Sequence, residues 1–179
     1  MATSTLLQKL DSEADGFGAG TSNRRQVETF IAAATVAVGQ WVALDLASVP
    51  LAISSNIDDY ADQALLIRPA ASDLSAAAGI ESDASIVVGV VLASAETSGT
   101  LTAGSKILVV TRGPAIAQVD AAGAKTDILT GMALMPDVTL TAGRVVAYTA
   151  ASTVRPCGVA LVASTTQNSI PVFVYPSVT

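Results

Sequence analysis

Short apolar runs rich in Val, Ile, Leu and Thr, separated by Gly, Pro, Asn, Asp and Ser, make up the chain from Val27 onward. Runs of this length and composition, bounded by turn residues, predict β-strands. Many short strands with frequent turns predict a mainly β fold, either a small barrel or a sandwich. We expect strands at residues 27–36, 41–46, 49–54, 64–68, 86–94, 106–111, 114–119, 129–134, 144–149, 157–163 and 170–175.

Helix is predicted in only two short pieces. Asn56 can cap a helix over residues 57–65, which would carry acidic residues in its first turn. Residues 72–78 predict a second brief helix that Gly79 ends. The fold class is therefore mainly β with one or two short helices.

The first 26 residues differ from the rest of the chain. An apolar turn with Leu6, Leu7 and Leu10 is followed by a Gly-, Ser- and Asp-rich segment in which Phe17 is the only large apolar residue. Such a segment cannot form a core of its own. We interpret residues 1–26 as an extended N-terminal arm that becomes ordered on a neighbouring molecule, and residues 27–179 as the β-barrel domain. A disordered tail is the alternative.

A repeated turn is the most informative feature of the sequence. Residues 100–104 and 139–143 both contain Thr-Leu-Thr-Ala-Gly, and residues 35–44 form a looser third copy. The pattern predicts the end of a strand, a tight turn that needs the positive φ of glycine, and a new strand. The three predicted turn glycines are Gly39, Gly104 and Gly143.

A second repeat has the same logic. Residues 89–94 (Gly-Val-Val-Leu-Ala-Ser) are similar to residues 158–164 (Gly-Val-Ala-Leu-Val-Ala-Ser), and each run leads into a Ser/Thr-rich turn and another apolar strand. The unequal spacing between copies argues against a solenoid. We therefore expect a single barrel that arose by a duplication and has since diverged.

These motifs resemble those of the capsid cement, or head decoration, proteins of tailed bacteriophages. The resemblance covers roughly Val27 to Tyr175 and is carried by residues 88–92, 101–104, 140–143 and 157–161. It implies a small β-barrel on the outer surface of a phage head, commonly as a homotrimer, with the major capsid protein as partner. It implies no catalytic residue.

Composition and charge narrow the remaining function classes. The net charge is −6, which argues against nucleic acid as a partner. Histidine is absent, so Ser-His-Asp catalysis and His-ligated zinc are excluded. No apolar run reaches the length of a membrane helix, and no signal peptide is apparent at the N-terminus. The mean hydropathy of +0.56, with only 4% aromatic residues, favours burial of apolar surface between chains.

Candidate chemistry is sparse. The acidic cluster Asp58, Asp59 and Asp62 lacks the spacing of a calcium loop and is interpreted as a solvated helix face. Cys157 follows Arg155 closely, yet a lone cysteine that begins an apolar strand is typical of a small core residue. No catalytic residue, metal or cofactor is predicted, and the chain is not expected to be an enzyme.

The preferred hypothesis is a structural virion protein that clamps capsomer seams from outside. The predicted contacts to the capsid or to a neighbouring subunit are Leu6, Leu7, Leu10, Phe17, Arg24 and Arg25. The alternative is a β-sandwich adhesin or tail-associated module that binds a carbohydrate or receptor. That alternative predicts a concave face with Trp41 or Tyr148 exposed.

Overall fold

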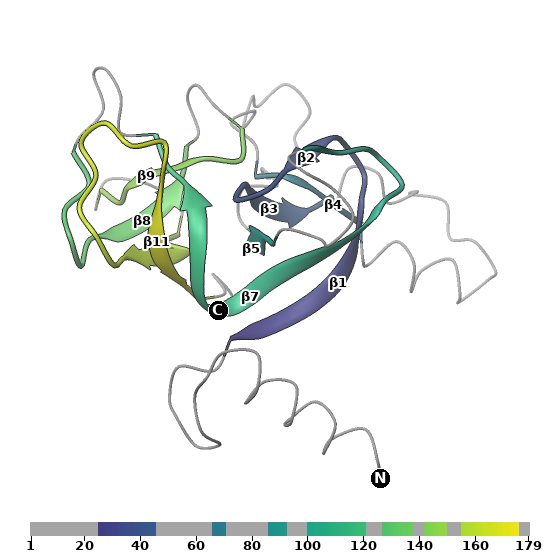
Figure 1. Ribbon diagram of the computed structural model, residues 1–179, viewed down its shortest axis with the longest axis horizontal. Coiled ribbons are helices and arrows are strands. Elements are labelled where there is room, and N and C mark those ends of the chain that lie inside the picture. The colour runs from purple at the N-terminus through teal and green to yellow at the C-terminus, as the bar shows by residue number, and fades with distance from the viewer. Residues whose placement is uncertain are drawn as a thin grey trace, which may run out of the picture.

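The computed structural model describes residues 25–45, 66–70, 86–92, 100–120, 127–137, 142–149 and 155–175. These residues form a mainly β fold (Figure 1), which confirms the predicted fold class, and contain no helix. The helices predicted over 57–65 and 72–78, and the strand predicted over 49–54, lie outside the described residues. The strands are β1 (Gln26–Ala32), β2 (Val36–Ala37), β3 (Trp41–Leu44), β4 (Leu66–Pro69), β5 (Val87–Val91), β6 (Thr100–Leu101), β7 (Lys106–Gln118), β8 (Ala133–Pro136), β9 (Val145–Ala147), β10 (Gly158–Ala160) and β11 (Ser169–Val174).

Five strands close the first barrel, which we call barrel 1. Their order is β1-β4-β3-β5-β7, and β7 pairs back with β1 to complete the ring. The β1–β4 pair is parallel, whereas the other pairs are antiparallel. Barrel 1 is the right-hand lobe of Figure 1.

The remaining long strands form a second ring, which we call barrel 2. The C-terminal half of β7 pairs with β11, and the order continues through β10 and β8 to β9. A parallel bridge between Val119 and Val145 joins β9 back to the end of β7, and the Asp120 amide donates to the Val145 carbonyl at 2.8 Å. Barrel 2 is the left-hand lobe of Figure 1.

The 13-residue strand β7 belongs to both barrels. Its residues up to Arg112 pair with barrel 1, and those from Gly113 onward pair with β11 of barrel 2. The sequence predicted two strands here, at 106–111 and 114–119, because Gly113 and Pro114 are typical strand breakers. The structure corrects this: Gly113, with φ of 105°, lies where the strand changes partners without ending.

The predicted small β-barrel is present as barrel 1, and the additional strands of barrel 2 repeat its topology. In each, the first strand is parallel to the third and antiparallel to the fifth, the second pairs with the third and fourth, and the fourth pairs with the fifth. Strand β7 is the fifth strand of barrel 1 and the first of barrel 2. The chain is thus an internal duplication whose two units share one strand.

Matching hydrogen bonds support this equivalence outside the ladders. Gly39 donates to the Val91 carbonyl at 2.9 Å, and Gly131 donates to the Ala160 carbonyl at 2.8 Å. At the other end of the second strand, the amide of Asp45 donates to Leu66 at 2.9 Å and that of Asp137 donates to Arg144 at 2.8 Å. Both turns and both strand ends therefore occupy the same places in the two units.

The two sequence repeats have different structural meanings. Gly89 and Gly158 occupy equivalent positions in β5 and β10, so the second repeat reports the duplication itself. The Thr-Leu-Thr-Ala-Gly repeat does not, because Gly104 precedes the fifth strand of barrel 1 while Gly143 precedes the third strand of barrel 2. That repeat marks a turn type used at non-equivalent places.

Two buried clusters form the core. One fills barrel 1 and includes Phe30, Val42 and Ile107. The other fills barrel 2 and also takes in outward-facing residues of barrel 1, among them Trp41 and Val90. The two barrels therefore share one continuous apolar junction, which holds them together as a unit.

Several predicted strand boundaries need correction: the strand predicted over 27–36 is split into β1 and β2, and the strand predicted over 157–163 ends at Ala160. The strand predicted at 129–134 is observed as β8, Ala133–Pro136, because Gly131, with φ of 84°, occupies the turn that precedes it. Gln26, the last residue of the predicted arm, already belongs to β1, where it pairs with Arg112 of β7. In the last two places, hydrogen bonding to a distant strand set the limit, which local composition does not report.

Candidate interaction surface

The predicted turn glycines have the backbone conformation that the repeat requires. The φ angles of Gly39, Gly104 and Gly143 are 80°, 85° and 80°, a region that residues with a Cβ rarely adopt. The glycines are not alike in their surroundings. A Cβ at Gly104 would meet nothing within 4 Å, whereas one at Gly143 would lie 2.9 Å from the side chain of Gln40. Gly143 is therefore also a packing position.

The turn around Gly39 fastens barrel 1 to barrel 2. The Gln118 amide donates to the Gly39 carbonyl at 2.7 Å, and its side-chain amide donates to the Val38 carbonyl at 2.9 Å. On the other side of the turn, the Trp41 amide donates to the Gly143 carbonyl at 2.9 Å. Barrel 2 closes between β7 and β9 through the bridge of Val119 with Val145, and we call this place its seam. The turn around Gly39 is hydrogen-bonded to residues at the ends of both strands that flank the seam.

Trp41 enters the core of barrel 2 next to this turn. Its side chain is fully buried, and its ring reaches Gly158, where an added Cβ would lie 2.7 Å from Cη2. Barrel 2 has Ala117 at the position that Phe30 occupies in barrel 1. The ring of Trp41 therefore supplies barrel 2 with the aromatic bulk that its own first strand lacks.

Barrel 1 buries part of its outer surface in this junction. The residues concerned lie on β3, β5 and β7 or follow β4, and all are at most 1% exposed: Trp41, Ala70, Val90 and Val110. The strand registers place Ala133, Tyr148, Val159 and Phe173 at the equivalent positions of barrel 2. We call these four residues the outer face of barrel 2.

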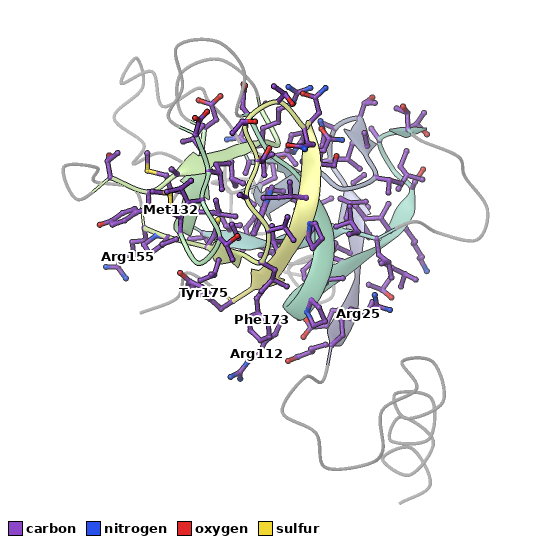
Figure 2. All side chains as sticks on the ribbon, turned by 60° about the vertical axis from the view of Figure 1, so that its left-hand side comes forward. Arg25, Arg112, Met132, Arg155, Phe173 and Tyr175 are labelled. Atoms are coloured by element: carbon purple, nitrogen blue, oxygen red, sulfur yellow. The ribbon has the colours of Figure 1, made fainter. Side chains whose placement is uncertain are left out.

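The outer face of barrel 2 is apolar and uncovered. Tyr148 is 37% exposed, and the other three residues are partly exposed. Phe173 projects outward from β11 at the lower side of the molecule in Figure 2. None of the four carries a charge, although the positions are accessible to solvent. A surface of this kind is typical of a protein–protein contact.

Further exposed apolar residues border this face. Leu161 is 44% exposed and its amide donates to the Pro171 carbonyl, which places it beside β11. Pro171 in turn is paired with Ile116, which is 61% exposed. Leu129 and Val162, in neighbouring turns, are 53% and 48% exposed. The apolar surface therefore extends across three strands of barrel 2.

A cavity opens at one end of barrel 1. Its volume is about 380 Å³, and its lining combines apolar residues such as Phe30, Leu44 and Val88 with the polar side chains of Glu28 and Arg112. Within this lining, the Gln26 side-chain amide donates to Glu28 Oε1 at 2.6 Å. Among the residues that line the cavity, Glu28 is the only carboxylate.

Charge is distributed unevenly between the interior and the surface. Asp45, Asp120 and Asp137 are buried, and Asp45 Oδ1 lies 3.8 Å from Arg68 Nε. Asp45 and Asp137 are equivalent positions, one at the end of each second strand. Part of the acidic excess of the sequence is therefore structural and does not act on partners.

Cys157 is a core residue, as the sequence predicts. Its side chain is fully buried, and Sγ donates to the Leu134 carbonyl at 3.5 Å. Burial raises the pKa of this thiol strongly, which opposes formation of a reactive thiolate. Burial, and secondarily the proximity of Cys157, also raises the pKa of Tyr175. Nothing at this position resembles a nucleophilic site.

The predicted arm contacts fall mainly beyond reach of the structure. Leu6, Leu7, Leu10, Phe17 and Arg24 lie outside the described residues, as does the acidic cluster of residues 58–62. Arg25 is described and is half-buried immediately before β1 (Figure 2). The predicted grouping of these contacts therefore stays a prediction.

The described ranges contain neither a metal-binding cluster nor a membrane-spanning helix. No group of three His, Cys, Asp or Glu side chains there could hold a metal ion. Across the same ranges, no helix has the length and apolarity needed to cross a membrane.

Sequence reasoning missed the outer face of barrel 2, although a signal for it exists. Residues 41–45 (Trp-Val-Ala-Leu-Asp) and 133–137 (Ala-Leu-Met-Pro-Asp) both end an apolar strand at a buried aspartate. Aligning these two runs pairs Trp41 with Ala133 and would have indicated the duplicated second strand.

No family model, curated protein or solved structure matches this chain.

Proposed function

We propose that this chain is a structural virion protein, a cement or decoration protein that binds the outer surface of a tailed-phage head. In this proposal it associates as a homotrimer, contacts the major capsid protein and stabilises the seams between capsomers. It acts without cofactor or catalysis. It assembles onto the head in the host cytoplasm and remains on the outside of the virion.

The observation that carries the proposal is the uncovered outer face of barrel 2. Ala133, Tyr148, Val159 and Phe173 present apolar, uncharged surface to solvent, and Leu161 extends it. A protein that acted alone on a small molecule would gain nothing from such a surface, whereas a subunit of a larger assembly buries it. The resemblance of residues 88–92 and 157–161 to decoration proteins indicates which assembly.

The interior of the fold agrees with a mechanical role. Each barrel contains a buried apolar cluster, and the close approach of Trp41 to Gly158 joins the two barrels. A rigid subunit that contacts several capsomers can resist their separation by many modest contacts acting together. The arm of residues 1–26, with Arg24 and Arg25, is proposed to supply the contact with the capsid.

Binding to empty heads tests this function. The full chain and a variant lacking residues 1–24, which leaves β1 intact, are mixed with DNA-free phage heads and sedimented. The full chain should co-sediment at saturable stoichiometry and raise the temperature at which the heads disrupt. The truncated variant should bind at least tenfold more weakly.

Two results would contradict the proposal. The panel of tailed-phage heads should include phages that infect the organism from which this chain comes. If the full chain neither binds nor stabilises any of these heads, the assignment is wrong. If the truncated chain binds as tightly as the full chain, the arm is not the contact. Circular dichroism of the truncated variant provides the control for folding.

One observation bears on the alternative function, binding of a carbohydrate or receptor. That function predicts an exposed Trp41 or Tyr148, but Trp41 is fully buried and only Tyr148, at 37%, is accessible. Of the two rings that this function calls on, Tyr148 alone is accessible, which makes a weak platform for a sugar. A glycan array with the full chain and with Tyr148→Ala measures this function directly.

A further inference from the structure

We infer that the outer face of barrel 2 is a self-association surface, and that its occupant is a second copy of this chain. The inference rests on the self-association in the proposed function and deepens it by naming the surface that would carry it. It rests on the internal duplication, which shows what a barrel of this type does with this part of its surface.

The equivalent surface of barrel 1 is buried inside the molecule. Its four residues, Trp41, Ala70, Val90 and Val110, are at most 1% exposed because barrel 2 lies against them. This surface thus buries itself against another copy of the same five-stranded unit. The contact is specific, because the turn at Gly39 and the Trp41 amide also make hydrogen bonds across it.

The same surface in barrel 2 is apolar and partly exposed. The register places Val159 of β10 where barrel 1 has Val90, and Phe173 of β11 where it has Val110. Both remain apolar, and the other two positions are Ala133 and Tyr148. The surface has kept its apolar character, yet the described residues form no further five-stranded unit that would cover it as barrel 2 covers the surface of barrel 1.

Strand β10 lies across barrel 2 from the seam that barrel 1 occupies, because the ring order is β7-β11-β10-β8-β9 and the seam lies between β9 and β7. Val159 therefore lies on the side of barrel 2 opposite this seam, and the outer face extends from it to Ala133 and Phe173 on the flanking strands and to Tyr148 just after β9. The contact between barrel 1 and barrel 2 shows that a surface of this kind packs against a five-stranded unit of this chain. A five-stranded unit from a second copy is therefore the partner that we infer.

Sedimentation velocity over about 1–100 µM protein tests the inference with matched variants of the full chain. Tyr148→Glu places a charge on the outer face of barrel 2, and Leu108→Glu places one on barrel 1, at a residue that is also 37% exposed. We expect the wild type to associate. Tyr148→Glu should raise the dissociation constant at least tenfold, and Leu108→Glu should leave it within twofold.

A labelling experiment covers the case in which Tyr148→Glu does not fold. The only native cysteine, Cys157, is fully buried, so a single introduced cysteine can be followed by maleimide labelling. Labelling of Tyr148→Cys should slow as protein concentration rises, whereas that of Leu108→Cys should not.

Three outcomes would overturn the inference. These are a wild type that sediments as a single chain at every concentration, equal weakening by the two glutamate variants, and labelling rates that do not change with concentration at position 148. No phage head is present in these experiments, so their failure would remove the homotrimer from the proposed function, whereas binding to heads has its own test.

Discussion

Barrel 1 and barrel 2 share a topology but differ in how each fills its interior. Barrel 1 fills its own core, with Phe30 on its first strand. Barrel 2 has Ala117 at that position and receives Trp41 from barrel 1. The comparison shows that two copies of one unit became interdependent through a few size changes, with the loss of bulk in one copy matched by an insertion from the other.

The two barrels also differ in how much of their outer apolar surface is buried. Barrel 1 hides its apolar outer residues against barrel 2, whereas barrel 2 leaves Val159 and Phe173 partly exposed. A duplicated unit therefore carries two equivalent surfaces, of which the fold covers only one. The proposals for function and for self-association both follow from this asymmetry.

The largest expected effect comes from removing the shared side chain. Trp41→Ala should lower the free energy of unfolding by about 3–5 kcal/mol, because it empties a large volume in the core. The loss should appear in barrel 2 although the residue belongs to barrel 1. Hydrogen exchange should therefore accelerate in β8, β10 and β11 at least as much as in β4.

Trp41→Phe is the matched control for this prediction. Within the described structure the indole Nε1 is buried with no hydrogen-bond partner, so a smaller ring without that N–H should cost less than half as much. Accelerated exchange confined to barrel 1 in Trp41→Ala would contradict the interdependence of the two barrels.

The equivalent glycines Gly89 and Gly158 come next. A Cβ at Gly89 would overlap the Val110 carbonyl, which is backbone and cannot move aside, so Gly89→Ala should cost about 2–3 kcal/mol. At Gly158 the Cβ would lie 2.7 Å from the Trp41 ring and 2.9 Å from the Phe173 carbonyl. Urea unfolding of both variants measures the two costs.

A double variant distinguishes the cause at Gly158. If the clash with the ring dominates, Trp41→Phe should recover part of the loss in Gly158→Ala and none of that in Gly89→Ala. Equal behaviour of the two glycine variants in both backgrounds would count against a special role for the Trp41 contact.

The turn glycines should give a smaller and graded effect. Gly104→Val and Gly143→Val both force a side chain into positive φ, which costs about 1–2 kcal/mol. Gly143→Val should be the worse of the two because its Cβ also meets Gln40, whereas Gly104 has open space. Unchanged melting temperatures for both variants would discredit the turn assignment.

The smallest effect is a dependence of stability on alkaline pH. Burial raises the pKa of Cys157, so the folded chain keeps the thiol protonated above pH 9 while the unfolded chain loses the proton. Stability is therefore fully present below the ordinary pKa of the thiol and falls above it, by about 1.4 kcal/mol per pH unit. Urea unfolding of wild type and Cys157→Ala at pH 7 and pH 10 measures the slope.

The control is the difference between the two proteins. Tyr175, whose pKa is also raised, should keep a residual fall in Cys157→Ala in the same direction. An identical slope in wild type and Cys157→Ala would show that another group causes the alkaline loss.

The candidate site was only partly accessible to sequence reasoning. Local pattern placed the turn at Gly143 and the core position of Cys157, because a glycine turn and a small apolar strand residue follow from neighbouring residues alone. The apolar character of Val159 and Phe173 is equally visible in the sequence. That these two residues face solvent is not, because exposure depends on which distant strand lies against them.

The sequence by itself determined a mainly β chain, most strand positions, the glycine turns and the relation between residues 89–94 and 158–164. These are local properties, set by side-chain period and backbone conformation within a few residues. Tertiary structure alone decided that β7 continues through Gly113 into a second barrel, and that Trp41 leaves its own barrel to fill the other. Both depend on pairing between residues far apart in the chain, and an alternating apolar pattern fits either partner equally well.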